Sequence, residues 1–61
     1  MEHASKGFLR CFNAEGEFLE QIDVIEGKTI YPPSGTVFIR PVSNAPSGEL
    51  SITLGENREA A

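Results

Sequence analysis

The sequence predicts an all-β fold, either a small antiparallel meander or an SH3-like or OB-like barrel of about five short strands. Glycine recurs at near-regular intervals along the 61 residues, and the stretches between are rich in Phe, Ile, Val and Thr. Glycine adopts positive φ without steric cost, so one every ~8 to 12 residues lets the chain reverse repeatedly. We therefore expect one β domain over 7–55, with flexible termini over 1–6 and 56–61. The glycines are Gly7, Gly16, Gly27, Gly35, Gly48 and Gly55.

The first two strands are expected to form a hairpin. Residues 8–12 are the first strand candidate, and the Asn-Ala-Glu-Gly sequence at 13–16 is typical of a four-residue turn. Residues 17–24 then return as the second strand. Alternation along this strand places Phe18, Ile22 and Val24 on one face.

The same segment also fits a helix at roughly 15–26, which would make the fold α+β. Asn13 could cap this helix and Gly27 could end it. We favour the strand because the preceding strand and turn both agree with a hairpin. The apolar residues that recur at helical spacing are Phe18, Leu19, Ile22 and Ile25.

The later strands are bounded by proline and glycine. A short strand over 28–31 must stop at the Pro-Pro pair that follows, since proline cannot donate a ladder hydrogen bond. Residues 36–42 have the highest strand propensity, and Pro41 predicts that this strand lies at an edge or carries a bulge. Residues 49–54 alternate polar and apolar side chains. This alternation directs three residues to the core, namely Leu50, Ile52 and Leu54.

Size and charge limit the possible classes of function. A chain of this length buries only about 60% of its unfolded surface. A single cysteine excludes an internal disulfide, and one histidine with one cysteine cannot supply the usual zinc ligands, so we expect self-association and no metal. The net charge of −4, with acids concentrated in 15–26, makes nucleic acid an unlikely partner. The absence of a signal segment and of a long apolar stretch predicts a cytoplasmic protein with no membrane association.

Catalytic chemistry has no support in the residues. His3 lies near the terminus without a partner, and Cys11 is expected to be a small buried apolar side chain. Phosphate-binding glycine motifs and calcium-loop spacing do not occur. We therefore predict a protein that is not an enzyme and that binds no cofactor.

Surface recognition remains as the expected function. Aromatic, cationic and rigid residues of the kinds enriched at interface cores occur close to Pro32, Pro33 and Pro41. We predict a protein–protein interaction module, such as an adaptor, an assembly subunit or an inhibitor, that self-associates through an edge strand or an apolar face. The predicted interaction residues are Tyr31, Phe38, Arg40 and Val42.

The alternative function is a small nucleic-acid-binding barrel. Aromatic side chains would stack on bases and scattered cations would contact phosphates. The excess of acidic over basic residues disfavours this alternative. Its candidate residues are Phe8, Phe12, Tyr31 and Phe38 for stacking, and Arg10, Lys28 and Arg40 for phosphate contacts.

Overall fold

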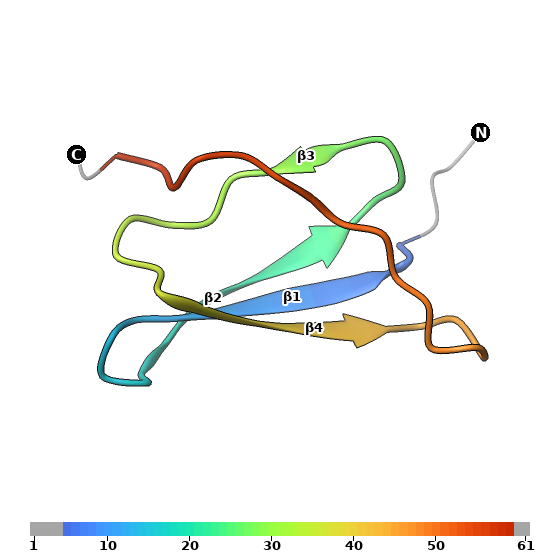
Figure 1. The fold of residues 1–61 in the computed structure, drawn as a ribbon, viewed down its shortest axis with the longest axis horizontal. Coiled ribbons are helices and arrows are strands. Elements are labelled where there is room, and N and C mark those ends of the chain that lie inside the picture. Colours follow the sequence, from blue (N-terminus) through green and yellow to red (C-terminus); the bar gives the residue numbers. More distant parts are fainter. Residues whose placement is uncertain (1–4, 60–61) are drawn as a thin grey trace.

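Three strands form one antiparallel sheet in the order β2-β1-β4, with β1 in the centre (Figure 1). The computed structural model describes residues 5–59, which contain strands and no helix. The prediction of an all-β fold is confirmed, and the alternative helix at 15–26 is wrong because this region holds a seven-residue strand. The strands are β1 Gly7–Phe12, β2 Phe18–Val24, β3 Thr29–Ile30, β4 Phe38–Ser43 and β5 Thr53–Leu54.

The strands do not close into a barrel. β3 and β5 form a separate parallel pair, in which Thr29 faces Thr53 and Ile30 faces Leu54. The three-stranded sheet therefore keeps two edges, at β2 and β4. β3 is only two residues long, and the Pro-Pro pair that begins two positions after it can donate no further ladder bond. Pro41 lies in the edge strand β4, as its presence predicts.

Asn13 fixes the turn between β1 and β2. Its side-chain Oδ1 accepts hydrogen bonds from the backbone N–H groups of Glu15 and Glu17, both at 2.9 Å. The N–H of Gly16 donates to the Asn13 carbonyl oxygen at 2.9 Å, and Gly16 has a φ of 82°, which a glycine adopts without strain. The predicted hairpin is confirmed.

A β-bulge at Leu19 changes which residues of β2 face the core. Cys11 pairs with Glu20, but the next residue, Phe12, pairs with Phe18, so Leu19 is the extra residue. The prediction that Phe18 shares a face with Ile22 and Val24 is therefore wrong. Strict alternation does not hold across the bulge, because the extra residue moves Phe18 to the opposite side of the sheet.

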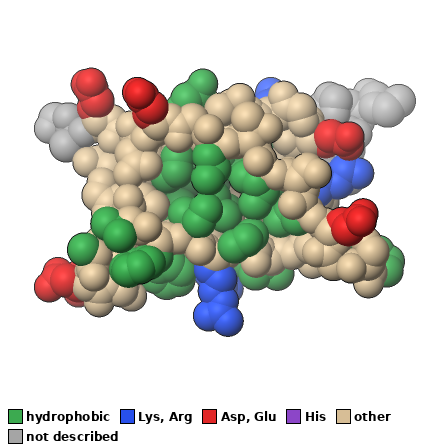
Figure 2. Space-filling model, in the orientation of Figure 1, with side chains coloured by type: hydrophobic (Ala, Val, Ile, Leu, Met, Phe, Trp, Pro, Cys, Tyr) green, Lys and Arg blue, Asp and Glu red, His purple; other side chains and the backbone are tan. Residues whose placement is uncertain are grey.

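The core lies between one side of the three-stranded sheet and the segments that carry β3 and β5. Figure 2 shows hydrophobic side chains gathered in the centre of this view. Leu50 and Ile52 pack against the core as predicted, whereas Leu54 is 44% exposed. The prediction for Leu54 is wrong because regular pairing covers only two residues of the expected strand and ends at Leu54. The buried core residues are Leu9, Cys11, Val24 and Ile30.

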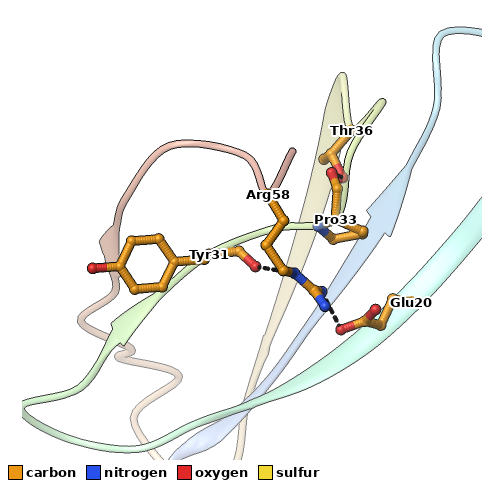
Figure 3. A network of polar contacts seen from close by, with 5 residues as sticks. All are labelled: Glu20, Tyr31, Pro33, Thr36 and Arg58. Carbon is orange, nitrogen blue, oxygen red and sulfur yellow. Dashed lines mark hydrogen bonds and ion pairs between the residues drawn. The ribbon is translucent and has the colours of Figure 1, made fainter. Parts of the chain in front are cut away.

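Arg58 ties the C-terminal segment to β2 and to the residues after β3 (Figure 3). Its guanidinium forms an ion pair with Glu20 and donates through Nε to the Tyr31 carbonyl oxygen at 3.0 Å. Its backbone N–H donates to Pro32 O at 2.7 Å. These contacts also give a partner to Glu20, the acidic residue of β2 that shares the core side of the sheet with Ile22. Residues 1–4 and 60–61 of the expected flexible ends lie outside the described residues.

We expect Arg58→Gln to lower the free energy of unfolding by about 1–2 kcal/mol, because it removes one ion pair and one side-chain hydrogen bond to the backbone. Urea denaturation followed by circular dichroism measures this change. The matched control is Lys6→Gln, which removes the more exposed ion pair with Glu26 and is expected to change stability by less than about 0.5 kcal/mol. Equal effects of the two substitutions would contradict the anchoring role of Arg58.

Candidate binding face

The side chains of the sheet that point away from the core form three cross-strand rows, which we call the outer face. Antiparallel register places one residue from each strand in every row, because directly opposite residues lie on the same side of a sheet. Each row thus combines residues far apart in the sequence. The rows are Phe18, Phe12 and Phe38; then Gln21, Arg10 and Arg40; then Asp23, Phe8 and Val42.

The aromatic row lies at the end of the sheet next to the β1–β2 turn. The rings of Phe12 and Phe18 meet edge to face, with centroids 5.9 Å apart and planes at 70°. Phe18 is 56% exposed and Phe38 is 54% exposed. Figure 2 shows hydrophobic side chains at the lower left, where Figure 1 has this turn and the start of β4. An exposed aromatic group of this size on so small a protein marks a candidate interaction surface.

The middle row places two arginines directly opposite each other. Arg10 is held by two contacts: its Nε donates to Gln21 Oε1 at 3.2 Å, and its Cζ lies 5.2 Å from the centroid of the Phe8 ring. Arg40 faces Arg10 across the β1–β4 ladder. Within residues 5–59, no carboxylate lies within 4.0 Å of either guanidinium. Like charges directly opposite on a sheet are destabilising, so this pair costs folding free energy and receives no compensating acid.

The segments that carry β3 and β5, which we call the second layer, cover the core side of the sheet and leave the outer face open. Both arginines, Gln21 and Asp23 are exposed in the middle and third rows, while Phe8 and Val42 are half-buried by their neighbours. The outer face therefore presents apolar, cationic and apolar rows to solvent, in that order along β1 and β4.

Three of the four predicted interaction residues come together on this face, namely Phe38, Arg40 and Val42. Tyr31 lies elsewhere. It follows β3 in the second layer, where its ring packs so closely on Gly55 that a Cβ there would lie 2.4 Å from Tyr31 Cε1. Phe18 was missed as a surface residue because of the bulge. The signal that could have revealed it is the adjacent Phe18-Leu19 pair followed by Glu20, which breaks strict alternation.

Other parts of the molecule give weaker evidence for a functional site than the outer face does. Cys11 is fully buried, as expected, and burial raises the pKa of its thiol, with a smaller opposing effect from a hydrogen bond with Thr36. A hollow of about 580 Å³ lies between loops and carries charges of both signs, including Lys6, Glu26 and Lys28. No cluster of three or more potential metal ligands occurs within residues 5–59, and His3 lies outside them. The same residues include no helix with the length and apolarity needed to cross a membrane.

Comparison with protein-family models, curated proteins and solved structures gives no match to this chain.

Proposed function

We propose that this chain is a non-enzymatic protein–protein interaction module, of the adaptor, assembly-subunit or inhibitor kind, that binds its partner through the outer face. The observation that carries the proposal is the exposed aromatic row beside the unneutralised pair of Arg10 and Arg40. Phenylalanine and arginine are enriched at interface cores, and arginine is also frequent among hot spots. The face is open, with Phe18 and Phe38 more than half exposed, which suits a macromolecular surface better than a small ligand.

Self-association belongs to the proposal, because the core within residues 5–59 is small, with four buried hydrophobic residues. An edge strand is one route. The free edge of β4 is interrupted by Pro41, which has no N–H to offer, whereas β2 contains no proline. The β2 edge is itself limited by the bulge at Leu19, so pairing there would involve the regular part of the strand, from Glu20 to Val24.

We expect Phe38→Ala to weaken self-association or partner capture by about 1–3 kcal/mol, since it removes an exposed aromatic anchor from the outer face. Sedimentation velocity over a concentration series measures the dissociation constant of the self-associated form. Tyr31→Ala is the matched control, because it removes an aromatic side chain of similar exposure from the second layer. A larger loss with Tyr31→Ala than with Phe38→Ala would reject the outer face as the interaction surface.

Single-stranded nucleic acid is the second candidate partner, and one observation favours it. Five of the seven candidate residues of the alternative function lie together on the outer face, namely Phe8, Phe12, Phe38, Arg10 and Arg40. Stacking platforms for bases have this composition. The net charge of −4 opposes it. A titration with an eight-nucleotide oligothymidine at low and moderate salt tests this candidate.

A further inference from the structure

We propose that the Arg10–Arg40 pair binds a carboxylate of an extended partner segment, in which an acidic residue is flanked two positions away on each side by apolar residues. This inference rests on the proposed function, because it names the chemistry of the partner at the same face. The three rows of the sheet match three alternate side chains of an extended peptide that lies across them.

The arginine pair has the properties of an anion site. Two guanidinium groups lie on neighbouring strands in direct register, and one of them is already oriented by Gln21 and Phe8. The chain is rich in acids, yet none within residues 5–59 forms an ion pair with either arginine. Asp23, the carboxylate of the outer face, lies one row away on β2, diagonal to Arg10, and forms no ion pair with it. An incoming carboxylate would relieve the repulsion and gain charge-assisted hydrogen bonds.

The flanking rows define the neighbours of that carboxylate. Residues two apart on a strand lie about 6.7 Å apart, since each residue advances the strand by 3.2–3.4 Å. An extended partner has the same repeat. With its acid over the arginines, one apolar side chain reaches the aromatic row at Phe12 and Phe38, and the other reaches Phe8 and Val42. Asp23 lies at the β2 end of its row, so the partner segment fits over β1 and β4.

Two other occupants fit the charges less well. A nucleic acid carries a phosphate at every nucleotide, and the aromatic row lies beside a turn that bears Glu15 and Glu17. A second copy packed face to face, about a two-fold axis through the middle row, would bring four guanidinium groups together, so self-association through this face must be centred on the aromatic row and supplies no carboxylate to the arginine pair. A segment with one carboxylate between apolar residues meets neither difficulty.

The test is an NMR titration of the ¹⁵N-labelled full chain with two blocked pentapeptides, Leu-Thr-Glu-Thr-Leu and Leu-Thr-Gln-Thr-Leu. Charge-assisted bonds favour the glutamate peptide, so we expect it to bind at least about 10-fold more tightly, with the largest shifts at the Nε–H signals of Arg10 and Arg40. In Arg40→Gln this preference should fall to about two-fold or less. In the control Lys28→Gln, which changes an exposed cation away from the outer face, the preference should remain.

Equal affinity for the two peptides, or a preference that survives Arg40→Gln, would overturn the carboxylate assignment. So would oligothymidine binding that is tighter than the glutamate peptide and is lost in Arg40→Gln. A loss of the peptide preference through misfolding can be distinguished from a loss of the anion site. Arg40 is exposed and its replacement relieves like-charge repulsion, so Arg40→Gln should keep the NMR spectrum of the folded protein. If neither peptide shifts the outer face while Phe38→Ala still weakens self-association, this inference fails and the proposed function stands.

Discussion

Leu9→Ala should leave a large fraction of the protein unfolded at 25 °C. Leu9 is fully buried at the centre of a core with four buried hydrophobic residues, and its replacement should cost about 2–5 kcal/mol. A single hydrophobic core in a domain of fewer than about 70 residues supplies at most about 3–5 kcal/mol of stability. The loss thus approaches the whole stability of the fold. Far-ultraviolet circular dichroism and urea titration of the variant measure the unfolded fraction directly.

Leu19→Ala is the matched control, because it makes the same chemical change at the bulge, where the side chain is 38% exposed. We expect a loss of less than about 1 kcal/mol, since little apolar surface leaves the core. If the two variants unfold at the same urea concentration, the buried cluster around Leu9 does not dominate stability. A folded Leu9→Ala with unchanged midpoint would lead to the same conclusion.

Local signals in the sequence were sufficient for the hairpin. Three signals each depend on only a few neighbouring residues, namely the Asn-to-Gly turn, the apolar stretches on both sides of it and the proline in β4. The structure agrees with all three. The bulge at Leu19 was not predicted, because the adjacent Phe18-Leu19 pair breaks the alternation but only the register against β1 shows which residue is the extra one.

The second layer depends on contacts between distant residues and was predicted less well. The parallel pairing of β3 with β5 joins residues more than 20 positions apart, and each strand contributes only two residues. Arg58 reaches Glu20 across 38 positions of sequence. Such contacts are chosen by the packed fold and not by the propensity of either segment. The alternation over 49–54 therefore indicated Leu50 and Ile52 correctly but failed at Leu54.

In the candidate site, too, the residues of one strand could be predicted, whereas their neighbours on other strands could not. Phe38, Arg40 and Val42 alternate along one strand, so the sequence could group them. Adding Phe12, Phe18 and Arg10 required the register of β1 against both neighbours. Tyr31 was grouped with them by composition and by its nearby prolines, and neither feature reports on which layer a residue occupies.

Gly7→Ala should cause the second large loss of stability, because β1 passes β4 too closely here for a side chain. A Cβ on Gly7 would lie 2.2 Å from the carbonyl oxygen of Val42 and 3.1 Å from Cα of Ser43. Both obstacles are backbone atoms of a paired strand, so they cannot move aside as a flexible side chain would. Gly7 also has a φ of 152°, which adds strain of about 1–3 kcal/mol for alanine.

We expect Gly7→Ala to lower the free energy of unfolding by at least about 2 kcal/mol, from conformational strain together with the clash. Gly48→Ala is the matched control, because Gly48 has a positive φ of 81° but open space around its Cα, so only the conformational cost applies. Urea denaturation of both variants separates the two effects. The β1–β4 ladder also positions Phe8 opposite Val42 and Arg10 opposite Arg40, so a folded fraction of Gly7→Ala should show reduced preference for the glutamate peptide. Equal destabilisation by the two alanines would mean that the strands separate at Gly7 without penalty, and the register of the outer face would then not depend on this close approach.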